Sequence, residues 1–259
     1  MKGTLSPQAA ENRSVILSGI QVTKHFGGLM ALGDVEFQLY EHEILGLIGP
    51  NGAGKTTLFH LIAGVYKPDR GSIHFRGEQI SGLRPDVICK KGIARTFQIT
   101  KPFLEMSTLE NVMVGSYFGS HGKRSLKDCK KPAENILQLV GLPDKHQILA
   151  SQLTLVERKR LELARVLSTQ PSVVLLDEVV AGLNPTETLE MVELIKKIRA
   201  EGITILMIEH VMKAIMGVSD RVIALNYGRK IAEGAPEEIV ANQEVIEAYL
   251  GGKTDAHSG

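Results

Sequence analysis

The segment Gly49–Thr56, which reads Gly-Pro-Asn-Gly-Ala-Gly-Lys-Thr, constrains the fold of this chain more than any other feature. It matches the pattern G-x-x-x-x-G-K-[ST] in full, and this pattern forms a loop that cradles phosphate groups. A short apolar run that starts at Glu43 precedes it, as a buried strand would, and apolar residues at helical spacing follow it. A turn that merely favours glycine would leave the Lys-Thr pair unexplained. The sequence therefore predicts a strand, a phosphate-binding loop and a helix within an α/β fold.

Each residue type in this loop suits a bound nucleotide. Glycines let the backbone approach a phosphate closely, and successive N–H groups with the helix N-terminus attract negative charge. Lys55 can reach the β- and γ-phosphates of ATP, and the Thr56 hydroxyl can bind Mg²⁺. The residues of this segment predicted to bind ATP are Gly49, Pro50, Asn51, Gly52, Ala53, Gly54, Lys55, Thr56 and Thr57.

A second apolar strand, VVLLDE, ends in Asp177 and Glu178. Carboxylates at the carboxyl end of such a strand lie at the usual ligand crevice of an α/β sheet. We predict that Asp177 holds Mg²⁺ through its water and that Glu178 polarises an attacking water. A solvated strand edge is the alternative for an isolated acidic pair.

Two further residues fit the same chemistry. The amide of Gln98, in RTFQITKPF, can both accept and donate, so it can contact Mg²⁺ and the attacking water. His210 follows the apolar run ITILMIE and can bridge the γ-phosphate and Glu178. By themselves these signals are weak, because a lone His is more often structural and a lone Gln usually lies at the surface. Together with Lys55, these residues form the predicted catalytic set.

The composition excludes several classes of protein. The 259 residues include 30 Lys and Arg against 29 Asp and Glu, and this near-neutral balance argues against a nucleic-acid-binding protein. No apolar run approaches the roughly 18 residues of a membrane span, and the first residues lack the apolar segment of a secretory signal. Cys89 and Cys129 lack zinc-binding spacing. We expect a globular protein that does not itself cross a bilayer.

The pattern of strands and helices predicts one interrupted domain. Residues 1–14 and 252–259 are expected to be flexible tails, and 15–251 a single ATP-binding domain. Alternating residues near the start predict an antiparallel β-subdomain, whereas SVVLLD, ITILMI and RVIAL predict buried parallel strands. A helical subdomain is expected as an insert at about 100–170. The fold class is therefore α/β, with a P-loop NTPase core.

These motifs together resemble the ATP-binding subunits of ABC transporters, over Val15–Gly251. The resemblance rests on GPNGAGKTT, RTFQ, VVLLDE and IEHVM in this order, and Phe26 in KHFGG corresponds to the aromatic residue that stacks on adenine. HFGGLMAL, RTFQITKPFLEMSTLENV, AGLNP and SDRVIALNYGRKIAEGAPEEI are most similar to ATPases of branched-chain amino-acid importers. The resemblance implies an ATPase at the cytoplasmic face of the inner membrane. It also implies as partners a second ATP-binding subunit, two transmembrane permease subunits and, indirectly, a periplasmic or extracellular solute-binding protein. The helical insert would receive the permeases.

The resemblance fails at one motif. The family signature LSGGQ is replaced by Leu153-Thr154-Leu155-Val156-Glu157, so two glycines that approach the partner's γ-phosphate are lost. Because the signature acts in trans, we expect unequal ATP sites and favour a heterodimer over a homodimer; a turn that tolerates Leu-Val is the alternative. Asn184, where the family more often has Asp, keeps the hydrogen-bonding shape without the charge.

Other functions remain open at the level of sequence. A related urea or amide importer, or a lipid or lipopolysaccharide exporter, would use the same ATP-site residues. A nucleotide-gated module without turnover is a further alternative, and Glu178 and His210 argue against it. A soluble ABC protein acting on DNA or the ribosome is disfavoured, because the chain has one cassette, no zinc cysteines and no basic surplus.

Overall fold

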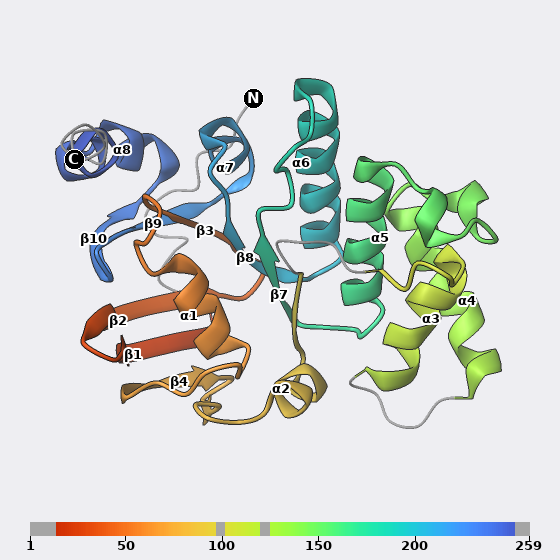
Figure 1. Ribbon diagram of the computed structural model, residues 1–259, viewed down its shortest axis with the longest axis horizontal. Helices are drawn as coiled ribbons and strands as arrows, with labels where there is room; N and C mark the ends of the chain where they lie inside the picture. Colours follow the sequence, from red (N-terminus) through yellow and green to blue (C-terminus); the bar gives the residue numbers. More distant parts are fainter. Residues whose placement is uncertain (1–13, 97–101, 120–124, 252–259) are drawn as a thin grey trace.

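The computed structural model describes residues 14–96, 102–119 and 125–251, which form two β-sheets and the helices packed against them (Figure 1). The larger sheet has the strand order β10-β9-β3-β8-β7-β6, and the smaller, antiparallel sheet has the order β2-β1-β4-β5. The larger sheet is built from β3 (Ile44–Ile48), β6 (Ile93–Arg95), β7 (Val173–Asp177), β8 (Thr204–Ile208), β9 (Arg221–Asn226) and β10 (Arg229–Gly234). The smaller one is built from β1 (Val15–Phe26), β2 (Leu29–Tyr40), β4 (Arg70–Phe75) and β5 (Glu78–Gln79).

Strands β3, β7 and β8 form the centre of the larger sheet, and every one of their residues is buried. They run parallel, as continuous apolar strands covered on both faces usually do. Successive residues of β7 enter opposite cores: Val174 and Leu176 pack in one buried cluster, Val173 and Leu175 in the other. The predicted α/β core is therefore confirmed.

Helices cover both faces of this sheet. Leu58 and Phe59 of α1 share one core with the smaller sheet, while Met191 of α6 and Ile215 of α7 pack in the other. The helices outside the segment between β6 and β7 are α1 (Lys55–Ile62), α2 (Pro85–Lys91), α6 (Pro185–Ala200), α7 (Met212–Val218), α8 (Pro236–Ala241) and α9 (Gln243–Gly251). Among the described residues, no helix is both long enough and apolar enough to span a bilayer.

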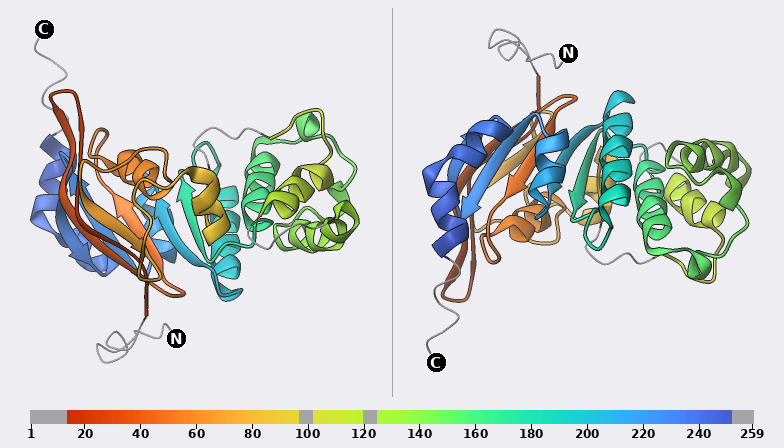
Figure 2. Two further views of the ribbon diagram at one scale, coloured as in Figure 1. Left: turned by 90° about the horizontal axis from the view of Figure 1, so that it is seen from below. Right: turned by 90° about the horizontal axis from the view of Figure 1, so that it is seen from above.

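The described residues between β6 and β7 are mainly helical. They form α3 (Thr108–Phe118), α4 (Leu126–Leu139), α5 (Leu155–Leu167) and the short 3₁₀ helices η2 (Pro143–Lys145) and η3 (Ala150–Gln152). Ser107 caps α3 in a capping box with Glu110, which satisfies N–H groups that the helix leaves unpaired. Figure 2 shows these helices as a lobe at the end of the molecule opposite α8 and α9.

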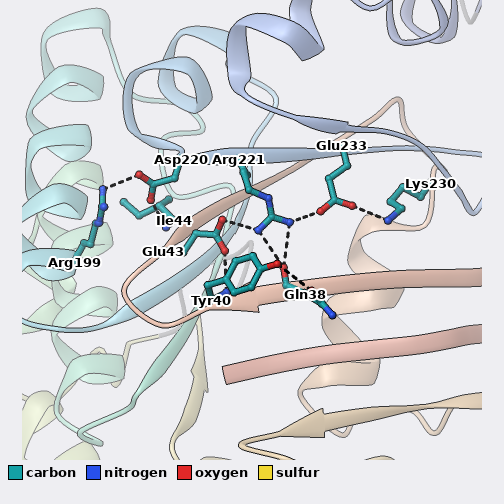
Figure 3. A network of polar contacts seen from close by, with 9 residues as sticks. All are labelled: Gln38, Tyr40, Glu43, Ile44, Arg199, Asp220, Arg221, Lys230 and Glu233. Carbon is teal, nitrogen blue, oxygen red and sulfur yellow. Dashed lines mark hydrogen bonds and ion pairs between the residues drawn. The ribbon is translucent and has the colours of Figure 1, made fainter. Parts of the chain in front are cut away.

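An ion-pair network around the buried Glu43 joins the two sheets (Figure 3). Glu43 is fully buried, and its carboxylate accepts a hydrogen bond from Arg221 Nη1 at 2.7 Å. Arg221, on β9, also pairs with Glu233 of β10 and contacts the carbonyl oxygen of Gln38 on β2. Burial raises the pKa of Glu43, and the nearby guanidinium opposes that shift. The network thus fixes β2 against the end of the larger sheet.

Candidate functional site

The loop between β3 and α1 can be formed only with glycine at key positions. Gly49 has φ +148°, and a Cβ there would lie 2.2 Å from the carbonyl oxygen of Leu225. Gly54 has φ +100°, and its Cβ would lie 2.5 Å from the carbonyl oxygen of Ala31. Gly52, with φ +78°, has no atom within 4 Å of the corresponding point. Two glycines therefore allow tight packing of the loop, and the third borders open space.

Lys55, at the first position of α1, points back into this loop. Its ammonium donates to the carbonyl oxygens of Gly49 at 2.7 Å and Pro50 at 2.9 Å. Burial lowers the pKa of Lys55, and the carboxylates of Glu178 and Asp177 counteract this effect. The ammonium is therefore enclosed by the loop and lies near both acidic residues.

Asp177 ends β7 and is one of the most buried charged residues described, at 2% exposure. Its carboxylate forms an ion pair with Arg95 Nη2 at 2.7 Å, and its backbone N–H donates to Thr96 Oγ1 at 3.0 Å. Asp177 and Thr56 line the same cavity of about 740 Å³, which runs between α1, α2, β6 and α5. Arg95 begins the RTFQ motif, but its pairing with Asp177 was not predicted, because only the fold places β6 beside β7.

Glu178 and His210 are brought together from different strands. His210 Nε2 lies 2.9 Å from Glu178 Oε1, and both side chains are partly exposed. Glu178 has φ +50°, an unfavourable conformation for a residue with a side chain. Its N–H donates to the carbonyl oxygen of Ile208 at 2.9 Å, so β8 helps to hold this conformation. Strained residues of this kind gather at functional sites.

Two buried charged residues form hydrogen bonds to the backbone of the turn after Asp177. Lys159 of α5 donates from Nζ to the carbonyl oxygen of Glu178 at 3.2 Å. Glu209, directly before His210, accepts a hydrogen bond from the N–H of Val180 at 2.9 Å. Burial raises the pKa of Glu209 to about 7, and the Lys159 ammonium opposes that rise. Sequence reasoning missed both residues: Glu209 directly follows β8, where His210 alone was singled out, and Lys159 lies inside α5 without a motif around it.

No described contact joins Phe26 or Gln98 to the other predicted site residues. The Phe26 ring, 41% exposed at the end of β1, packs edge-on against the ring of Tyr66 with centroids 5.2 Å apart. Strand β2, which follows Phe26, does reach the phosphate-binding loop through Gly228. The N–H of Gly33 on β2 donates to the carbonyl oxygen of Gly228 at 2.9 Å, and the N–H of Gly228 donates to the carbonyl oxygen of Ala53 at 3.1 Å. Gln98 lies outside the described residues.

The altered segment at the start of α5 forms an ordinary capped helix. Thr154 Oγ1 accepts from the N–H of Glu157 at 3.4 Å, and the Glu157 carboxylate accepts from the N–H of Thr154 at 3.0 Å. None of the described residues 153–157 has a positive φ. The absence of glycine therefore causes no backbone strain in this chain. What Leu155 and Val156 add is side-chain volume, and Leu155 is 49% exposed.

Comparisons with known proteins agree on one family. Residues 32–181 match the family model described as ABC transporter, and residues 229–254 match the one described as branched-chain amino acid ATP-binding cassette transporter. The chain is 42% identical over 249 residues to the high-affinity branched-chain amino acid transport ATP-binding protein LivG of Escherichia coli K12, covering 91% of this chain and 98% of the relative. It is 40% identical to BraF, described in the same words, of Pseudomonas aeruginosa, with the same coverage.

Solved structures support the same conclusion. A nucleotide-free ATP-binding cassette from an ABC transporter superposes with a TM-score of 0.84 at 29% identity, covering 91% of this chain and 99% of the other. A cassette in its ADP conformation superposes with a TM-score of 0.85 at 29% identity, covering 92% and 99%.

Proposed function

The chain belongs to the ABC transporter family of ATP-binding proteins, and from this premise we propose that it is the ATP-hydrolysing subunit of an importer for branched-chain amino acids. One observation carries the catalytic part of the proposal. Lys55 lies far in sequence from the consecutive residues Asp177 and Glu178, yet both carboxylates counteract the lowering of the pKa of its ammonium by burial. The importer part rests on the relatives named above and on the second family match, at residues 229–254.

In this proposal the loop from Gly49 to Thr57 binds the phosphates of ATP, and the ring of Phe26 stacks on the adenine. The open space at Gly52 leaves room for phosphate, and Lys55 is already directed into the loop. Thr56, Asp177 through a water, and Gln98 are the proposed magnesium ligands. Hydroxyl and carboxylate oxygens in one cavity fit a hard divalent cation. Mg²⁺ would there neutralise charge on the phosphates.

The proposed catalytic step depends on the pair Glu178 and His210. The Glu178 carboxylate orients a water and takes up its proton, while the hydrogen bond at 2.9 Å from His210 fixes where that carboxylate points. Lys55 stabilises the negative charge that develops on the transferred phosphate. Gln98 is proposed to touch the same water.

The chain is further proposed to work within a larger assembly. A second ATP-binding subunit would complete each ATP site, two permease subunits would dock on the lobe of α3–α5, and a solute-binding protein would deliver the amino acid. This assembly places the chain at the cytoplasmic face of the inner membrane as a peripheral subunit. We propose residues 15–251 as one ATP-binding domain, with a helical subdomain at about 100–170 and tails at 1–14 and 252–259.

The start of α5 supports unequal sites in a heterodimer. Leu155 and Val156 add volume where the helix would face the partner's nucleotide, so the site built on the partner's loop is the weakened one. The test replaces the equivalent catalytic glutamate in each subunit singly. We expect Glu178→Gln to abolish most ATPase activity and the partner's substitution to change it little; equal losses would disprove the asymmetry.

The main test reconstitutes the transporter in vesicles and follows ATP-dependent leucine uptake with phosphate release. We expect both in the unaltered complex and neither in the complex with Glu178→Gln, which should still bind ATP. Urea uptake without leucine uptake would instead favour a urea importer. Phosphate release no higher than in the variant would favour a nucleotide-gated module.

A further inference from the structure

The last helix of the described chain reaches the phosphate-binding loop. Tyr249, near the end of α9, places its hydroxyl oxygen 2.9 Å from the backbone nitrogen of Gly49, which donates a hydrogen bond to it. Gly49 follows directly on β3, whose last residue paired with β9 is Ile48. The tyrosine hydroxyl therefore takes up a backbone donor at the point where the sheet ends and the loop begins.

Gly49 connects this hydroxyl to the lysine of the loop. Its N–H is bound by Tyr249, and its carbonyl oxygen accepts from Lys55 Nζ at 2.7 Å. A side chain at Gly49 would clash with the carbonyl oxygen of Leu225, so the residue packs closely against β9. Gly49 thus forms hydrogen bonds to both the C-terminal helix and the Lys55 ammonium. Consecutive hydrogen bonds of this kind polarise and so strengthen one another.

The position of the hydroxyl is set by the fold of the C-terminus. Val245 lies four residues before Tyr249 and therefore on the same face of α9. It is 4% exposed and packs with Ile239 of α8 in the buried cluster that also contains Val174 and Leu176. Asn242 caps the helix, since its side-chain oxygen accepts from the N–H of Val245 at 3.2 Å. Burial raises the pKa of Tyr249, so its hydroxyl stays protonated and neutral at physiological pH.

We propose that Tyr249 is a positioning residue for nucleotide binding, which holds the first turn of the phosphate-binding loop in its binding conformation through Gly49 and Lys55. The proposal rests on ATP binding at this loop and adds a role for the C-terminal helix to it. A loop that is already ordered loses less conformational freedom when the nucleotide binds, and so binds it more tightly. Without the hydroxyl, the N–H of Gly49 has no acceptor from α9 and the loop samples more conformations before binding.

The test compares Tyr249→Phe, which removes only the hydroxyl, with the unaltered full chain. We expect the dissociation constant for ATP to rise about tenfold, a change equivalent to about 1.4 kcal/mol. In the reconstituted transporter, we expect the KM for ATP to rise while kcat stays within about twofold, a split that a loss of stability alone does not produce. Hydrogen exchange of the peptide containing Gly49 should be faster in the variant.

Tyr40→Phe is the matched control, because it also loses a hydroxyl hydrogen bond, to Gln38 at 3.0 Å, but at the end of β2. We expect its ATP affinity to equal that of the unaltered chain. An affinity of Tyr249→Phe within about twofold of the unaltered chain would overturn the inference, whatever its melting temperature. Failure of the unaltered chain to bind ATP would instead refute the proposed function.

Discussion

The buried pair Arg95 and Asp177 gives the sharpest prediction about stability. The two side chains are only 8% and 2% exposed, and their charged atoms are 2.7 Å apart. Arg95→Met keeps much of the volume of the side chain but leaves the Asp177 carboxylate buried without this cation. Removing one partner of such a pair typically costs about 3–5 kcal/mol, because the remaining charge is not compensated. For a chain of this length, that loss lowers the melting temperature by about 6–20 °C.

A second substitution separates the charge effect from packing. In Arg95→Met/Asp177→Asn the buried carboxylate is replaced by a neutral amide, so we expect at least half of the lost stability to return. Both variants are compared by urea unfolding of the full chain without nucleotide. Lys196→Met, which breaks an exposed pair with Glu193, is the control and should not change the midpoint measurably. A loss below about 1 kcal/mol in Arg95→Met, or a double variant no more stable than the single one, would refute this reasoning.

Three further predictions follow from the turn after Asp177 and from α5. Burial raises the pKa of Glu209 from 4.5, its value in an unfolded chain, to about 7 in the folded chain. The contribution of this group to the stability of the folded chain is therefore complete below pH 4.5 and is lost as the pH rises through 7. Thermal unfolding should therefore show the unaltered chain losing stability relative to Glu209→Gln between about pH 4.5 and about pH 7; parallel curves would contradict this. Lys159→Met removes the donor to the Glu178 carbonyl and should lower the kcat of ATP hydrolysis about tenfold, with Lys159→Arg retaining most activity; equal kcat values in all three proteins would argue against it. Thr154→Ala removes the cap bound by Glu157 and should cost about 1 kcal/mol in urea unfolding, whereas Thr154→Ser should cost little.

The sequence features that correctly predicted the fold are local patterns of residues. The loop from Gly49 to Thr56 requires particular residue types at fixed spacing, so eight consecutive residues are enough to predict phosphate binding. The strand ending in Asp177 is recognisable because a strand buried on both faces must be apolar throughout. The residue pattern within each of these short segments is enough to identify it, which is why the α/β core was predictable.

The contacts that complete the site are not local. Arg95 lies 82 positions before Asp177, Lys159 reaches Glu178 from another helix, and Tyr249 meets Gly49 across 200 positions. Nothing in the spacing of these residues predicts the contacts, because each contact forms only once the fold places its element beside the loop or the acidic strand. The sequence by itself determined the phosphate-binding loop and its acidic strand. Only the tertiary structure decided which distant side chains hold them, because a hydrogen bond depends on positions in space and not on separation along the chain.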